Sequence, residues 1–189
     1  MLRELIIRNR SYRRFDEAHE IGADVLRELV DHARLSASAA NLQPLKFILS
    51  CTAKKNGTIF PCLGWAAYLK DWPGPPAGQR PSAYIIVLGD SGITKTFGCD
   101  HGIAAQSILL AAAEKGLGGC MIASIQRNKL REALSIPKKL EILLVIALGR
   151  PAEEVRIEEV GQDGKVEYWR DDEGVHHVPK RRLDDIIIG

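Results

Sequence analysis

The spacing of hydrophobic positions changes several times along the chain, and each change marks an expected element. Residues 2–8 have the spacing of a short amphipathic helix. A second helix begins near Asp24, which can serve as its N-cap. Its apolar side chains recur every three or four residues, at Val25, Leu26, Leu29, Val30 and Ala33. Two apolar runs, 46–50 and 84–89, predict strands, and the second is apolar on both faces, which indicates a central place in a sheet.

Residues 100–115 give the strongest helical pattern in the chain, because almost every position around the helix is apolar. One stripe holds Ile103, Ala104, Ser107, Ile108, Ala111 and Ala112, and other positions hold Ala105, Leu109, Leu110 and Ala113. A helix that is hydrophobic all round is buried on all sides. In a chain of 189 residues, we expect part of that burial to be against a second subunit.

The second half of the chain continues to alternate between helical and extended patterns. Four residues, Gly116 to Gly119, end the long helix and lead into a strand near 120–123. A short helix capped by Asn128 and a strong strand over 140–148 follow. Strands that alternate with helices favour an α+β or α/β layer arrangement around one central sheet.

Three local patterns predict details between these elements. Lys54-Lys55-Asn56-Gly57 is typical of a turn after the first strand. Residues 60–72 are expected to form a helix that carries Trp65 and Trp72. In the tail, Asp163-Gly164 separates two alternating segments and predicts a hairpin turn.

Composition indicates one domain that spans residues 1–189 and excludes several function classes. The net charge of +2, from 26 basic and 24 acidic residues, gives no overall field for nucleic acid. The four cysteines lack the paired spacing of a zinc site and are expected to be buried, reduced thiols in a cytoplasmic protein. The start of the chain is too charged for a secretory signal, and no uncharged apolar run is long enough to span a membrane.

Candidate chemistry is concentrated in three separated clusters at 8–15, 38–44 and 180–182. The first and last are basic, and guanidinium groups with a serine hydroxyl suit a phosphate. The middle cluster contains Asn41 and Gln43, whose amides suit a neutral heterocycle with donors and acceptors. Together the clusters indicate a bound phosphorylated ring compound, although each basic run taken alone is also typical of a solvated surface.

Other catalytic patterns are absent from the sequence. The glycines at 116–119 follow a helix and open a strand, whereas a dinucleotide fingerprint has the opposite order, and no Walker loop is present. His176 and His177 are adjacent, so on a strand they face opposite ways and are poorly placed to share one metal ion. Ser38 and Ser124 lack the glycine-flanked turn of a serine hydrolase.

Taken in order, the motifs resemble those of the nitroreductase family of flavin enzymes. The resemblance begins with Arg10-Ser11-Tyr12-Arg13-Arg14-Phe15 and Ser38-Ala39-Ala40-Asn41-Leu42-Gln43-Pro44. It continues through Asp100, Gly102, Ala104 and Gln106 to Ala147-Leu148-Gly149 with Pro151, and closes with Lys180 and Arg182. Each motif is short, but their order extends over essentially the whole chain.

The resemblance implies an α+β fold with a central, mostly antiparallel mixed sheet flanked by helices, in an intertwined homodimer that binds FMN at the subunit interface. By position, Arg10, Ser11, Lys180 and Arg182 would bind the FMN phosphate, and Arg13 would reach the pyrimidine end of the flavin. The resemblance places Ser38, Asn41 and Gln43 along the flavin ring, some of them from the partner chain. Backbone groups of the segment that includes Met121, Ile122 and Ala123 would approach its other edge.

The implied activity is ping-pong reduction of nitro compounds, quinones or a similar small acceptor by NADH or NADPH. The flavin carries the chemistry, so no side chain is needed as acid or base and no metal is expected. Departures from the family pattern are Asn9 in place of an arginine, with Arg8 beside it, Ala37 in place of a proline and Leu45 in place of a tryptophan. Two alternatives stay open: a specialised flavin reaction such as dehalogenation, enone reduction or flavin fragmentation, and a non-catalytic flavin-binding protein.

Overall fold

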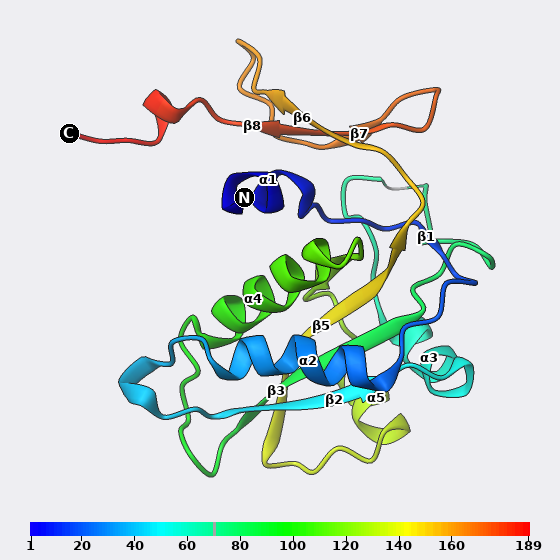
Figure 1. The fold of residues 1–189 in the computed structure, drawn as a ribbon, viewed down its shortest axis with the longest axis vertical. Helices are drawn as coiled ribbons and strands as arrows, with labels where there is room; N and C mark the ends of the chain where they lie inside the picture. The colour runs from blue at the N-terminus through cyan, green and yellow to red at the C-terminus, as the bar shows by residue number, and fades with distance from the viewer. Residues whose placement is uncertain (70) are drawn as a thin grey trace.

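A five-stranded sheet between two layers of helices makes up the body of the protein (Figure 1). The computed structural model describes residues 1–69 and 71–189. The strand order is β1 (Phe15–Asp16), β5 (Leu140–Pro151), β3 (Ala83–Asp90) and β2 (Leu45–Ser50), and β4 (Gly118–Ile122) also pairs with β5. All four of these strand pairings are antiparallel. This confirms the α+β class and the central place predicted for the strand at 84–89.

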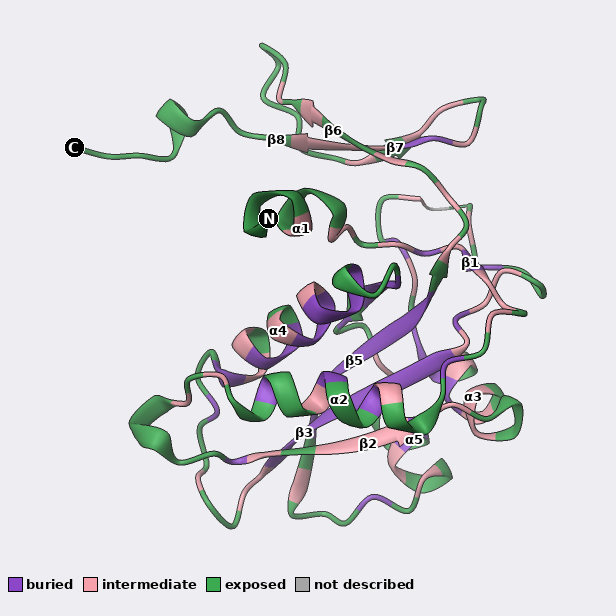
Figure 2. Ribbon diagram, viewed as in Figure 1, coloured by how far each residue is buried: buried purple, intermediate pink, exposed green. Residues whose placement is uncertain are grey.

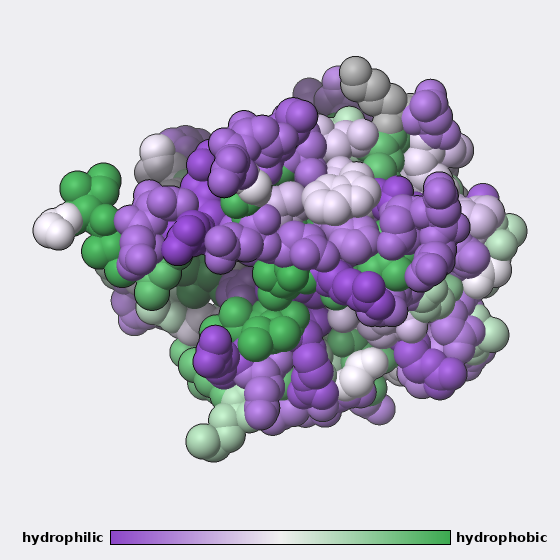
Figure 3. Space-filling view, turned by 90° about the horizontal axis from the view of Figure 1, so that it is seen from above, coloured by the Kyte–Doolittle hydropathy of each residue, from purple (hydrophilic) through white to green (hydrophobic). Residues whose placement is uncertain are grey.

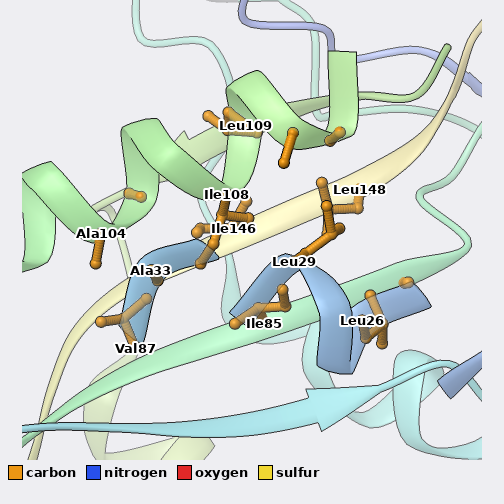
Figure 4. Close-up of a cluster of buried hydrophobic side chains, with 14 of the residues drawn as sticks. Leu26, Leu29, Ala33, Ile85, Val87, Ala104, Ile108, Leu109, Ile146 and Leu148 are labelled. Carbon is orange, nitrogen blue, oxygen red and sulfur yellow. The ribbon is translucent and has the colours of Figure 1, made fainter. Parts of the chain in front are cut away.

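One face of the sheet is covered by α2 (Ala23–Arg34) and α4 (Asp100–Glu114). Alternate residues of the central strand, such as Ile85 and Val87, meet Leu26, Leu29 and Ile108 of these helices (Figure 4). The opposite face packs against α3 (Ala53–Ile59) and α5 (Arg127–Ala133) through residues that include Ile86 and Leu130. The purple core in Figure 2 therefore follows β3 and β5.

The long helix is buried as its sequence predicted, but mostly within its own chain. Eight of its residues are buried, on the side that faces the sheet and α2. The short α1 (Leu2–Arg8) lies over the other side of α4 (Figure 1) and has no buried residue of its own. Gly116, which has a φ of +73°, stands just past the helix end, so the glycine-rich run terminates the helix as expected.

A second, three-stranded sheet lies beyond α1, above the main body in Figure 1. Its order is β6 (Val155–Glu159), β8 (His176–Lys180) and β7 (Trp169–Arg170). The segments before and after Asp163-Gly164 contain β6 and β7, and these strands do not pair with each other. Each of them pairs with β8 instead. The turn is present, but the predicted hairpin is wrong: the later strand His176–Lys180 is inserted between its arms.

Several local predictions are also wrong. The predicted Lys54–Gly57 turn lies inside α3, where the Asn56 amide donates to Ser82 O at 2.7 Å and so supports the helix from outside. Of the helix expected at 60–72, the described residues form only the 3-10 turn Phe60–Cys62, and Lys70 lies outside the described residues. Helix α2 is capped by Gly22 rather than Asp24, and α5 by Gln126 rather than Asn128.

Two further searches bear on the function classes. Across residues 1–69 and 71–189, no helix combines the length and apolar character needed to cross a membrane. The same residues contain no group of three histidine, cysteine or acidic side chains arranged to hold a metal ion.

Candidate functional site

A cavity of about 340 Å³ opens between the segment after α1, the middle of α4 and the C-terminal sheet. It brings together Arg10, Ser11, Arg13, Met121 and Lys180, which lie far apart in the sequence. Three of these five side chains are cationic, so the cavity suits an anionic ligand. The other lining residues are Asn9, Gln106, Leu109, Tyr168, His176 and Val178.

Backbone contacts with β4 hold the basic segment in place. Ser11 forms a parallel bridge with Gly119, and the Tyr12 N–H donates to Gly119 O at 3.0 Å. A Cβ atom at Gly118 would lie 2.4 Å from the Tyr12 ring, so only glycine allows this approach. The sequence therefore fixes the basic segment to the edge of the sheet through the same glycines that end α4.

The carboxylate of Glu153 organises the other side of this segment. Glu153 Oε1 accepts from the backbone N–H groups of Arg13 and Arg14. Its Oε2 accepts from Arg170 Nη2 at 2.7 Å, and the Glu153 side chain is only 1% exposed. One buried acid thus links the basic segment to β7 of the C-terminal sheet.

Arg13 is the most enclosed cation of the cavity, with 9% of its surface exposed. Its Nη1 donates to Ser11 O at 3.2 Å and lies 3.1 Å from His176 Nε2. The guanidinium carbon stands 4.6 Å from the centre of the Tyr168 ring, which is a cation–π distance. Burial lowers the pKa of the neighbouring Arg10 guanidinium, whose Nη2 is bonded to Ile6 O.

A second cavity of about 170 Å³ continues from the first and shares Arg13, Met121 and Tyr168 with it. The predicted residues Ile122 and Ala123 line it, together with Gly64, Trp65, Ala66, Ala67, Cys120 and Ser124. The loop that carries Trp65 is anchored to the end of β4, because the Gly64 N–H donates to Ser124 O at 2.8 Å. Burial raises the pKa of the Cys120 thiol, which makes it a poor nucleophile.

The middle cluster is not part of these cavities. Ser38 Oγ donates to Asp100 Oδ2 at 2.6 Å and accepts from the Gln43 N–H, so the loop is wrapped around the start of α4. Ser38 and Gln43 line a separate cavity of about 240 Å³ beside Asp100. Ala40, Asn41 and Gln43 have φ angles of +50°, +54° and +50°, an unusual strain for non-glycine residues.

Of the remaining residues predicted to bind the phosphate, some line the first cavity and others do not. Lys180 lines the first cavity, whereas Arg182 is exposed and its Nε lies 3.7 Å from Glu159 Oε1. Asn9, at the position of the expected arginine, lines the cavity. The carbonyl of Arg8 accepts from the Tyr12 hydroxyl at 3.0 Å.

Sequence reasoning missed Glu153, Tyr168 and His176. Tyr168 was counted only as part of an alternating tail, and Glu153 stands in an acidic pair with no motif. His176 was considered only as a metal ligand; it is fully buried, while His177 faces the other way toward Glu158 and Asp171. The opposite orientation of the two histidines agrees with the strand argument.

The comparisons with known proteins agree with one another. The model of the Nitroreductase family matches residues 6–59 and 70–150. A relative from Methanothermobacter thermautotrophicus, named "Putative NADH dehydrogenase/NAD(P)H nitroreductase", is 31% identical over 157 residues, which are 79% of this chain and 77% of the relative.

Solved structures give the same result. An FMN-dependent nitroreductase from Clostridium difficile R20291 is 25% identical, with a TM-score of 0.65 over 79% of this chain and 87% of its own. A protein from Exiguobacterium sibiricum that is named a "putative nitroreductase" and was solved in complex with FMN is 17% identical and shares the fold, with a TM-score of 0.67 over 81% of this chain and 89% of its own.

Proposed function

The chain belongs to the nitroreductase family, and we therefore propose that it is an FMN-dependent oxidoreductase that uses NADH or NADPH to reduce nitro compounds, quinones or a similar small acceptor. The observation that carries this proposal is the cationic cavity formed by Arg10, Ser11, Arg13 and Lys180. It supports a phosphate-bearing cofactor, and the smaller cavity beside Met121–Ser124 supports a flat ring next to it.

The residues present fit FMN. The phosphate would be held by Arg10, Ser11 and Lys180, whose donors face one cavity. Arg10 Nε is buried without a hydrogen-bond partner in the described part of the chain, so this donor is available to a ligand. Arg182 would join this set by turning away from its exposed pair with Glu159.

The ring would lie against the backbone of Met121, Ile122 and Ala123, with Arg13 at its pyrimidine end. Bound FMN supplies the hydride chemistry, and the chain supplies binding, orientation and a positive charge. In the ping-pong scheme the nicotinamide would give up its hydride and leave in its oxidised form before the acceptor enters the same open face. The chain therefore needs no acid or base of its own.

We place the middle cluster in the site of a partner subunit. Ser38, Asn41 and Gln43 lie at one end of α4, away from the cationic cavity of their own chain (Figure 1). A twofold assembly would supply them to the neighbouring flavin, so this separation supports an intertwined homodimer built from one domain per chain. The four free cysteines favour the cytoplasm, although only Cys62 and Cys120 are buried as predicted, whereas Cys51 is half-buried and Cys99 is exposed.

Exposed hydrophobic side chains also support the homodimer. Leu2, Ile6 and Ile7 of α1 are at least 45% exposed, and Ile186, Ile187 and Ile188 at the C-terminus are at least 59% exposed. Figure 3, which views this side of the molecule, shows green atoms on the projecting end and in a patch between purple side chains. A second copy of the chain would cover these surfaces.

The test is an absorbance spectrum of the purified protein after addition of FMN. We expect a shifted flavin spectrum, loss of the absorbance under anaerobic NADH or NADPH, and its return with a nitroaromatic or a quinone. Failure to bind FMN would contradict the proposal. Flavin that is reduced but not reoxidised by any member of an acceptor panel would favour a specialised flavin reaction instead.

A further inference from the structure

The Arg13 side chain is buried and forms no ion pair with a described residue. Its guanidinium is bonded to two neutral acceptors, Ser11 O and His176 Nε2. The buried acid Glu153 accepts from the Arg13 backbone and from Arg170, not from the Arg13 guanidinium. Within residues 1–69 and 71–189, no carboxylate forms an ion pair with the Arg13 guanidinium, so its charge has no direct partner.

The contact with Arg13 defines the state of His176. An arginine only donates hydrogen bonds, so His176 Nε2 must accept and the ring proton must sit on Nδ1. Burial, followed by the Arg13 charge, lowers the pKa of His176 to about 4, which keeps the ring neutral near pH 7. Nδ1 is buried and has no partner among the described residues, an arrangement that costs stability and so is not explained by folding alone.

We propose that His176 is a positioning residue that holds the Arg13 guanidinium at the cavity with a neutral acceptor and so preserves its charge for the ligand. This inference rests on the proposed function, in which Arg13 faces the pyrimidine end of FMN. His176 belongs to the C-terminal sheet, which lies beyond residue 150, where the match to the family model ends. Tyr168 from the same sheet covers the guanidinium at 4.6 Å and limits its movement.

The physical reason for a neutral holder is the charge of reduced flavin. A cation beside the pyrimidine ring favours the reduced, anionic form over the oxidised, neutral form. A carboxylate at position 176 would fix Arg13 equally well but would cancel its field, whereas an apolar side chain would leave the field but release the guanidinium. A neutral acceptor holds the guanidinium in place and leaves the charge of Arg13 intact.

Three substitutions separate these effects. In FMN-loaded protein, His176→Gln retains a neutral acceptor, His176→Glu introduces a charged one and His176→Leu removes it. We expect His176→Glu to weaken the binding of reduced FMN relative to oxidised FMN by at least tenfold, which lowers the two-electron potential by about 30 mV. His176→Leu should lower the two-electron potential less, and the potential of His176→Gln should remain nearest to that of the unaltered protein.

A double-substitution cycle identifies the route of the effect. The His176→Glu shift should disappear in an Arg13→Met background, because the carboxylate then has no guanidinium to neutralise. His177→Gln, on the opposite face of β8, is the matched control and should leave the potential unchanged. Equal potentials for the Gln and Glu variants, or an undiminished Glu shift without Arg13, would overturn the inference. Absence of FMN binding by the unaltered protein would instead overturn the proposed function.

Discussion

Arg170 and Glu153 form a buried ion pair, with Arg170 Nη2 2.7 Å from Glu153 Oε2 and side-chain exposures of 11% and 1%. Glu153 also accepts hydrogen bonds from the backbone N–H groups of Arg13 and Arg14, so the pair joins β7 of the C-terminal sheet to the basic segment. Its loss would therefore affect both stability and the cationic cavity.

The first prediction concerns this pair. Glu153→Gln leaves Arg170 buried without a counter-charge, and breaking a buried pair in this way typically costs about 3–5 kcal/mol. We expect a loss of about 3 kcal/mol in the free energy of unfolding, measured by urea denaturation followed by circular dichroism, together with weaker FMN binding.

Glu154→Gln is the control for this variant. Glu154 is the next residue, but its pair with Arg156 is exposed on both sides, at 53% and 58%. Exposed pairs contribute little, so we expect the free energy of unfolding to stay close to that of the unaltered protein. Equal losses for the two substitutions would show that the buried pair has no special role.

The second prediction is a pH dependence of stability that comes from His176. Its folded pKa of about 4 lies below the ordinary value of 6.5, chiefly because of burial. The unfolded chain therefore binds a proton at His176 between pH 6.5 and 4 that the folded chain does not. Neutral His176 therefore makes its full contribution to the free energy of unfolding above pH 6.5. This contribution is lost as the pH falls toward 4, at up to about 1.4 kcal/mol per pH unit.

Urea denaturation at several pH values checks this, with His176→Gln as the comparison. The difference in unfolding free energy between the two proteins should shrink as the pH falls from 6.5 to 4. His177 should affect the pH dependence of stability in the opposite direction, because hydrogen bonds to Asp171 and Glu158 raise its pKa. Its contribution is present below pH 6.5 and lost as the pH rises through its raised value, so His177→Gln should matter most at low pH. A pH-independent difference for His176→Gln would contradict the prediction.

The core elements could be predicted because their spacing is set by burial alone. The continuous apolar run Tyr84–Leu88 is what a strand buried on both faces requires, the apolar helix at 100–115 is what packing on a sheet requires, and both are present. The tail could not be predicted in the same way. Short strands such as Trp169–Arg170 have little propensity of their own, and their partner β8 lies later in the chain, so the apparent hairpin was misleading.

The site was predictable only in part for a similar reason. Arg10, Ser11 and Lys180 were found because basic clusters suit a phosphate and matched a family pattern, and they line one cavity. Glu153 and His176 carry no motif, and their roles depend on long-range contacts with Arg13. Only the folded chain reveals that one acid of the pair Glu153-Glu154 and one histidine of the pair His176-His177 are buried beside the same arginine.

The third prediction tests the homodimer. Ile6 of α1 is 45% exposed, and Ile6→Glu would place a charge in the proposed interface. We expect the mass measured by light scattering to fall by half at micromolar concentration and FMN affinity to fall at least tenfold, because each site would lose the partner's Ser38–Gln43 loop. Ile93→Glu is the matched control: Ile93 is 43% exposed in the loop between β3 and α4 and should not change the mass. An unchanged dimer with Ile6→Glu would exclude α1 from the interface.

The fourth prediction tests the phosphate site with the double variant Arg10→Ala and Arg182→Ala. Each removed guanidinium takes away a charge-assisted hydrogen bond, worth about 1.5–3 kcal/mol, so FMN should dissociate at least a hundredfold more readily. Flavin fluorescence quenching gives the dissociation constant directly. The double variant Arg34→Ala and Arg156→Ala removes the same charge from exposed ion pairs and should keep its affinity within about threefold, since distant exposed charges are screened by salt. If both double variants bind FMN equally well, the phosphate is held elsewhere and the cationic cavity is not the cofactor site.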